Sequence, residues 1–179
     1  MAAATTGDVI RKRMMLVGDA DCGNLTISCF SLFSRASLYL EVELTLVNTQ
    51  GLDDYDRFLD EQYQDADIIL LCFSVVNLVS LQNVVAKWYT QWKYALKHHP
   101  RTINFIVLVG LESDLRHDGD GRKKQQPIST EEGRKIAERI KASGYIECSA
   151  KTKENVEKVF EMATRISLEE EPRRRAQTI

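Results

Sequence analysis

The feature that most constrains this chain is a pair of glycines, Gly18 and Gly23, placed after a continuous apolar run. Met14–Met15–Leu16–Val17 leads into the first glycine, four residues follow, and the second glycine opens a segment with helical periodicity. This is the frame of a phosphate-binding loop, in which a strand, a glycine turn and a helix follow one another. Glycines let successive backbone N–H groups point inward, and the helix dipole adds partial positive charge there. The frame therefore predicts a nucleotide-binding type of domain.

Two side chains that such a loop needs are missing. A Lys holds the β- and γ-phosphates and a Ser or Thr hydroxyl holds Mg²⁺, but Asn24 and Leu25 occupy these two positions. Thr26 lies one residue later, about 100° further round the helix, so we do not expect it to substitute. The sequence thus keeps the backbone frame and lacks the groups that hold nucleotide and metal.

The bulk composition is that of one ordinary globular domain. The chain has 179 residues, 44% hydrophobic and 28% charged, and a net charge of −2 argues against a general nucleic-acid binder. The spacing of the cysteines fits no zinc pattern, so we expect reduced, buried thiols in a cytoplasmic protein. We expect no signal peptide and no membrane span. The four cysteines are Cys22, Cys29, Cys72 and Cys148.

Strand-like and helix-like segments alternate along the chain. Strands are expected over residues 10–17, 38–47, 68–73, 103–109 (ended by Gly110) and 145–148. Helices are expected over residues 24–36, 53–64, 78–96, 129–142 and 155–168, with a capping box at Ser129 and Gly144 after that helix. This alternation predicts an α/β fold with a doubly wound, mostly parallel sheet, whose ligands bind at the carboxyl ends of the strands. We expect one domain over residues 1–168 and a charged, disordered tail over 169–179.

From about Arg13 to Leu168 the chain resembles the Rho family of small GTPases, within the Ras superfamily. The segments that carry the resemblance are Gly51–Arg57, Leu70–Ser74, Val109–Arg116, Glu132–Arg134, Gly144–Lys153 and Val159–Arg165. The resemblance implies a G domain that binds GTP or GDP with Mg²⁺ and signals through protein partners. Its guanine-reading segments correspond to Val109–Arg116 and Ser149–Ala150–Lys151.

The nucleotide motifs depart from the family pattern. Ala20 replaces the second loop glycine, and Asn48 replaces an Asp that reaches Mg²⁺ through water. Leu52 replaces the Gln that orients the attacking water. In the guanine motif Leu111 and Glu112 replace Asn and Lys, whereas Asp114 is kept. Between about Ala36 and Val42 there is no room for a switch I loop and a second strand, so its phosphate-sensing threonine has no counterpart.

We interpret the remaining site residues with an alternative beside each. Gly18 and Gly23 either contact phosphate or serve the turn; Asp114 either accepts from a guanine or caps the turn after its strand. Lys151 either stacks on a base or is a solvated lysine. The residues expected to line the nucleotide site are Gly18, Asp19, Ala20, Asp21, Cys22, Gly23, Asn24, Gly51, Asp114, Ser149, Ala150 and Lys151.

The resemblance also predicts a partner-binding face. It places this face at the switch II-like residues Tyr55, Asp56, Arg57 and Phe58. Trp88 is expected in the core together with Trp92. We expect a monomer, and no prenyl anchor because no cysteine lies near the C-terminus.

Two hypotheses follow. Losing the lysine, one metal ligand and the switch I threonine removes more than about 4 kcal/mol, or roughly a thousandfold in affinity. We therefore expect GTP or GDP to bind weakly at most, Mg²⁺ not to bind, and hydrolysis to fail. The first hypothesis is a pseudo-GTPase that acts through protein partners. The alternative is a divergent Rho protein that still binds GTP, does not hydrolyse it and regulates the actin cytoskeleton. A third interpretation is a variant product of limited stability, whose exposed sheet edge would aggregate.

Overall fold

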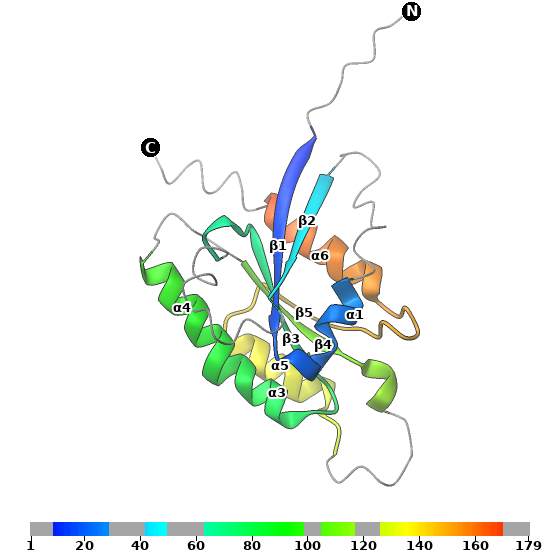
Figure 1. Cartoon of the computed structure of the whole chain (residues 1–179). Helices are drawn as coiled ribbons and strands as arrows, with labels where there is room; N and C mark the ends of the chain where they lie inside the picture. Colours follow the sequence, from blue (N-terminus) through cyan, green and yellow to red (C-terminus); the bar gives the residue numbers. More distant parts are fainter. Residues whose placement is uncertain (1–8, 29–41, 50–62, 99–104, 117–125, 170–179) are drawn as a thin grey trace, which may run out of the picture.

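The computed structural model describes residues 9–28, 42–49, 63–98, 105–116 and 126–169. These residues contain a five-stranded sheet with the order β2-β1-β3-β4-β5 (Figure 1). The strands are β1 (Ile10–Gly18), β2 (Val42–Asn48), β3 (Ile68–Ser74), β4 (Phe105–Leu111) and β5 (Gly144–Glu147), and all neighbours are parallel. This confirms the expected α/β class with a parallel sheet.

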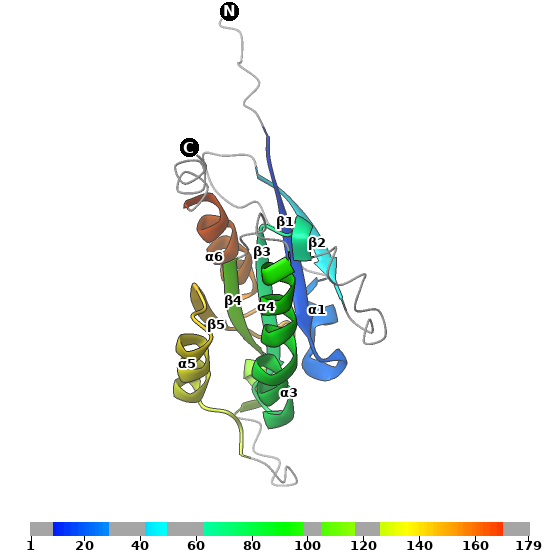
Figure 2. The ribbon, with the colours of Figure 1, turned by 90° about the vertical axis from the view of Figure 1, so that its left-hand side faces the viewer.

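Helices cover both faces of the sheet (Figure 2). One face carries α3 (Leu78–Asn83), the π-helical segment η3 (Val84–Trp88), α4 (Tyr89–His98) and α5 (Thr130–Arg139). The other carries α1 (Asn24–Ser28) and α6 (Val156–Glu169). Two short 3₁₀ turns, η1 (Ala20–Cys22) and η4 (Ser113–Arg116), follow the ends of β1 and β4. The chain order reverses between β1 and β3, which is where ligands bind in doubly wound sheets.

The centre of the core is β3, as its sequence predicts. All seven residues of Ile68–Ser74 are buried, because β1 and β4 flank this strand and helices cover both of its faces. Alternate side chains of β3 enter the two separate core clusters. A strand with apolar residues at every position is the one that fits this central place.

The basic start of β1 is compatible with a strand because each charge has an acidic neighbour. Arg11 Nε lies 2.8 Å from a Glu43 carboxylate oxygen on β2, and Lys12 Nζ lies 3.6 Å from Asp67. Arg13 Nη1 lies 3.1 Å from Asp65. The side chain of Lys12 is only 6% exposed, so its ion pair offsets the desolvation of the ammonium group.

The helix expected over 78–96 forms, and it contains a π turn. Asn77 caps it by accepting from the N–H groups of Val79 and Ser80. In the π turn the N–H of Tyr89 donates to the carbonyl of Val84, five residues back. The helix then runs on to His98. A π turn within an α-helix changes the direction of the side chains that follow it.

Some predicted boundaries are wrong. The fourth strand does not end at Gly110 but runs to Leu111, because Gly110 pairs with Phe73 on one side and Glu147 on the other. The helix after Ser129 has the predicted capping box but ends at Arg139, not Ala142. Lys141, with φ 54°, takes the left-handed position that was expected for a glycine.

Several expectations fall outside the described residues. They include the end of the first helix, most of the helix expected over 53–64, the loop before Pro127 and the residues after Glu169. Residues 63–65 are helical, and Glu169 is the last residue of α6 rather than the first of a tail.

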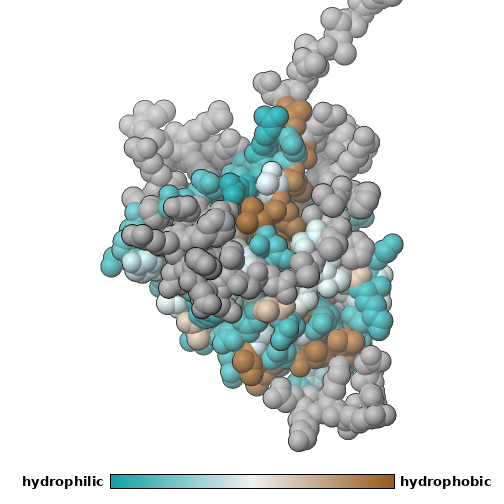
Figure 3. Space-filling model, viewed as in Figure 1, coloured by the Kyte–Doolittle hydropathy of each residue, from teal (hydrophilic) through white to brown (hydrophobic). Residues whose placement is uncertain are grey.

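The described surface is mainly hydrophilic on the face shown in Figure 3, with limited hydrophobic areas. The large hydrophobic side chains that are exposed are Val9, Leu78, Val79 and Tyr94. Exposed apolar residues of this number are ordinary for a globular protein. In the described part of the chain, no helix combines the length and hydropathy needed to traverse a bilayer.

Candidate functional site

The loop between β1 and α1 has the glycine frame that its sequence predicts. Gly23 adopts φ 88°, a left-handed conformation that favours glycine, and its carbonyl accepts from Thr26 and Ile27 as α1 begins. A Cβ on Gly18 would lie 2.5 Å from the carbonyl oxygen of Cys72. Both glycines therefore have a structural reason to be present, whether or not a phosphate is bound.

The carboxylate of Asp19 links this loop to α3 and η3 by hydrogen bonds. Its Oδ1 accepts from the indole Nε1 of Trp88 at 2.8 Å, and its Oδ2 accepts from Nδ2 of Asn83 at 2.8 Å. Residues five apart in a regular α-helix would point about 140° away from each other. The π turn between them brings Asn83 and Trp88 to the same carboxylate. This contact holds the loop with groups of the chain itself.

The carboxyl ends of the strands enclose a small pocket beside Gly23. Its volume is about 140 Å³, below the roughly 300–1,000 Å³ that is usual for ligand pockets. It unites predicted site residues from three segments of the chain. The lining residues are Gly23, Thr26, Leu111, Glu112, Asp114, Leu115, Ala150 and Lys151.

Asp114, Ser149 and Lys151 lie close together beside the pocket. The hydroxyl of Ser149 donates to Asp114 Oδ1 at 2.6 Å, and Lys151 Nζ lies 3.8 Å from Oδ2. Ser149 is fully buried, whereas the side chain of Lys151 is 75% exposed. The carboxylate of Asp114 is thus bound to the neighbouring loop.

Glu112 stands where relatives are expected to carry the lysine of the guanine motif. It adopts φ 62°, and its Oε2 accepts from the hydroxyl of Ser74 at 2.5 Å. Its side chain lies over Gly23: a Cβ on that glycine would be 3.5 Å from Glu112 Cγ and 3.8 Å from Oε1. A negative charge therefore lies beside the loop at a place where the family pattern has a positive one.

An ion pair that sequence reasoning missed holds the two sides of the pocket. Arg116, in η4, donates to both carboxylate oxygens of Glu147 at 2.6 and 2.8 Å, and also to the carbonyl of Ile128. Tyr145 and Thr130 donate to the same carboxylate at 2.5 and 3.2 Å. The signal in the sequence that could have predicted this ion pair is a basic residue after β4 and an acidic residue at the end of β5, because these are the carboxyl ends of adjacent strands.

This network shifts the pKa values of its members. Burial alone would raise the pKa of Glu147, but hydrogen bonds from Arg116, Tyr145 and Thr130, with the charge of Arg116, lower it overall. Its hydrogen bond to Glu147 raises the pKa of Arg116 against the opposing effect of burial. Burial, then the Glu147 carboxylate, raises the pKa of Tyr145. The Arg116–Glu147 pair thus stays ionised at neutral pH, so it ties η4, which carries Asp114, to β5 next to Ser149.

The cysteines of the described residues are free and buried, as the sequence predicts. Burial and, to a lesser extent, Glu154 raise the pKa of Cys148 to about 12. Burial also raises the pKa of Cys72, with smaller contributions from Cys22 and Cys148. Thiols in this state are poor nucleophiles. Cys29 lies outside the described residues.

The tryptophans lie in the core, as predicted. Trp88 is 4% exposed, and Trp92 packs partly buried against the same cluster. Within the described ranges, no group of three or more metal-binding side chains is present. Gly51 of the predicted site lies outside the described residues, and so do Leu52, at the place of the water-orienting Gln, and the partner face from Tyr55 to Phe58.

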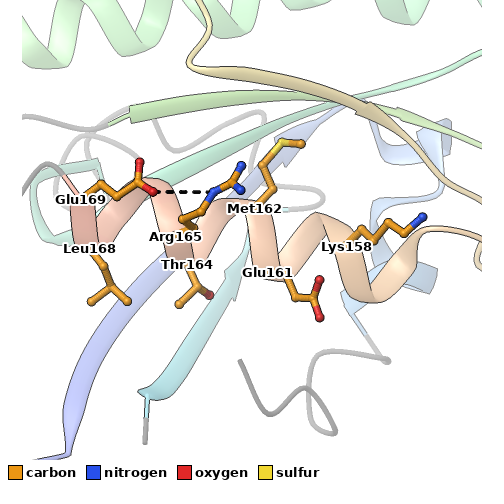
Figure 4. Close-up of a pocket in the computed structure, with 7 residues that line it drawn as sticks. All are labelled: Lys158, Glu161, Met162, Thr164, Arg165, Leu168 and Glu169. Atoms are coloured by element: carbon orange, nitrogen blue, oxygen red, sulfur yellow. Dashed lines mark ion pairs between the residues drawn. The ribbon is translucent and has the colours of Figure 1, made fainter. Parts of the chain in front are cut away.

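A larger hollow of about 590 Å³ lies along α6, away from the pocket at the carboxyl ends of the strands (Figure 4). All its described lining residues come from this one helix, and Arg165 and Glu169 form an ion pair 3.8 Å apart across its rim. Among the described residues, it brings together no side chains from different elements and contains none of the predicted site residues. The pocket at the strand ends is therefore the better candidate site.

A comparison with known families decides what kind of domain this is. A model of the Ras family matches residues 26–169. The chain belongs to the Ras family. It is therefore a small-GTPase-like signalling domain, and its pocket lies at the end of the sheet where that fold binds nucleotide. The matched residues begin at Thr26, after the glycine loop, and include β2 to α6.

Proposed function

We propose that this Ras-family domain is a Rho-like pseudo-GTPase, which keeps the G-domain shape and acts through protein partners without a bound Mg²⁺–nucleotide. The observation that carries this proposal is the pocket beside Gly23. It is small, and Glu112 contributes a carboxylate where the family pattern has a lysine. A site of this charge repels a triphosphate instead of attracting one.

The residues of the loop support the same proposal. Asn24 and Leu25 lack the ammonium and hydroxyl groups that hold phosphate and Mg²⁺. The loop is held instead by Asp19, whose two bonds to α3 and η3 need no ligand. A nucleotide is thus not required to keep the loop in place. The mass-action stabilisation that a tightly bound ligand gives its protein would be missing.

The Rho assignment and the partner face rest on sequence. The segments Leu70–Ser74, Val109–Arg116 and Gly144–Lys153 resemble Rho proteins. By that resemblance a protein partner binds at Tyr55–Phe58, in the cytoplasm, and the domain acts as a monomer with no nucleic-acid partner. A scaffold or decoy role follows, because the domain would have the shape of a GTPase but would not be switched by a bound nucleotide.

The alternative is a GTP-binding Rho protein that cannot hydrolyse GTP and regulates the actin cytoskeleton. One observation favours it: Asp114, Ser149 and Lys151, to which the resemblance gives the recognition of guanine, lie close together. Ala20 and Leu52 would then hold the protein in a GTP-bound state. The loss of the phosphate lysine counts against this alternative.

Titration with a fluorescent GTP analogue separates the two functions. The pseudo-GTPase proposal predicts no saturable binding up to about 100 μM with Mg²⁺, the range in which a weak Kd is readable. A variant with Asn24→Lys and Leu25→Thr is the matched control, because it restores both missing groups and should gain affinity. Micromolar binding by the natural chain that disappears with EDTA would support the alternative instead.

A further inference from the structure

Glu112 is held beside the glycine loop by one hydrogen bond to its side chain and one to its backbone. The hydroxyl of Ser74 donates to Oε2 at 2.5 Å, and the same hydroxyl accepts from the N–H of Val76 at 3.3 Å. Ser74 itself is 1% exposed. At the backbone, the N–H of Leu115 donates to the carbonyl of Glu112 at 3.0 Å. The carboxylate is therefore held in position and cannot easily swing away from an approaching ligand.

Among the residues that the structure describes, no cation pairs with this carboxylate. Asp114 has Lys151 as its ionic partner at 3.8 Å. Glu112 has only the neutral hydroxyl of Ser74 as a side-chain partner among the described residues, and no cation. The pocket walls otherwise consist of Leu111, Leu115 and small groups. The pocket thus combines apolar walls with hydrogen-bond acceptors and a net negative charge.

We propose that Glu112 is a specificity-determining residue that excludes phosphate-bearing ligands from this pocket and leaves it open to an uncharged ring with N–H donors, such as the base of a free nucleoside. The proposal rests on the proposed function and extends it. Absence of the phosphate lysine only removes an attraction, whereas Glu112 adds a repulsion. An anion received by the loop amides near Gly23 would lie close to the Glu112 carboxylate, and at an effective dielectric constant of about 20 two like unit charges roughly 6 Å apart repel each other enough to weaken binding by at least tenfold.

The experiment compares guanosine, GMP and GDP, which share one ring and differ in phosphate charge. Binding to the full-length chain is followed by the ¹⁵N–¹H signals of Gly23 and Leu115, without Mg²⁺ and at low salt. The proposal predicts that affinity decreases from guanosine to GMP and from GMP to GDP. In Glu112→Gln the ratio of GMP to guanosine affinity should rise by about tenfold, or about 1.4 kcal/mol.

Two further variants sharpen the comparison. Glu161→Gln removes the same charge from the exposed face of α6 and should leave the ratio unchanged. Ser74→Ala frees the Glu112 side chain without changing any charge, and should raise the ratio by less than Glu112→Gln does. Thermal unfolding of each variant verifies that it is folded. High salt should narrow the difference between Glu112→Gln and the natural chain.

The outcomes separate the two proposals. Equal ratios in Glu112→Gln and Glu161→Gln, with GDP still unbound, would overturn the role of Glu112 and leave the pseudo-GTPase proposal intact. No response to guanosine in any variant would equally overturn it. Tighter binding of GDP than of guanosine by the natural chain would contradict both proposals.

Discussion

The contact between Asp19 and Trp88 makes a quantitative prediction about how the loop is held. Hydrogen bonds to a charged group contribute about 1.5–3 kcal/mol, and the lower part of that range applies because Asp19 is only half-buried. Replacing Asp19 by Ala leaves the amide of Asn83 and the indole N–H of Trp88 without their acceptor. We expect Asp19→Ala to lower the free energy of unfolding by about 2–3 kcal/mol.

A double-mutant cycle isolates the bond itself. Asp19→Ala, Trp88→Phe and the double variant are unfolded in urea and followed by far-UV circular dichroism. The cycle should give a coupling energy of about 1.5–2 kcal/mol. Asp21→Ala is the control, because Asp21 is an exposed acidic residue of the same loop and should change stability by less than about 0.5 kcal/mol.

Nuclear magnetic resonance adds an independent test of the same contact. The chain has two tryptophans, so its spectrum has two indole N–H signals. The signal of Trp88 should move strongly in Asp19→Asn, while that of Trp92 stays near its place. A coupling energy below about 0.5 kcal/mol, together with an unmoved Trp88 signal, would refute the idea that this carboxylate holds the loop.

Three other predictions follow from the packing of the site. Gly18→Ala should destabilise the protein by about 2–3 kcal/mol in urea unfolding, because its Cβ would meet the carbonyl of Cys72 at 2.5 Å; an unchanged midpoint would contradict the close approach. Arg116→Gln should lower the free energy of unfolding by about 3 kcal/mol at neutral pH, because it leaves the carboxylate of Glu147 without its cation. The pKa of Glu147 is lower in the folded than in the unfolded protein, so the stability it gives is fully present above the unfolded pKa and is lost as the pH falls through the folded one. Unfolding free energies measured between about pH 7 and pH 3 should therefore fall less steeply in Arg116→Gln than in the natural chain, and parallel curves would count against this linkage. In a Cys29→Ser variant, the three remaining thiols are buried and should react with Ellman's reagent only as the protein unfolds; fast reaction of the folded protein would contradict that burial.

Local sequence patterns predicted those elements whose structure depends on residues that are close together in the chain. The apolar run Ile68–Phe73 could only be a strand covered on both faces, and it is. The capping box at Ser129 set the start of α5, because both of its hydrogen bonds lie within four residues. Gly18 and Gly23 predicted the turn between β1 and α1 for the same reason.

What the sequence could not predict depends on contacts between distant segments. The bond from Asp19 to Trp88 joins residues far apart in the chain, and it needs a π turn that no local propensity indicates. The end of α5 was misplaced because Lys141, rather than a glycine, adopts the left-handed conformation. Glu112 was identified as a departure from the family pattern, but its tether to Ser74 became visible only once β3 and β4 lay side by side.

The nucleotide content of the purified natural chain tests the central claim most directly. The protein is isolated under native conditions with Mg²⁺ present, denatured, and the released nucleotides are separated and quantified against protein concentration. If the glycine loop is held by the chain's own side chains and Glu112 repels phosphate, essentially no guanine nucleotide should be released. Near-stoichiometric GDP or GTP would contradict the account.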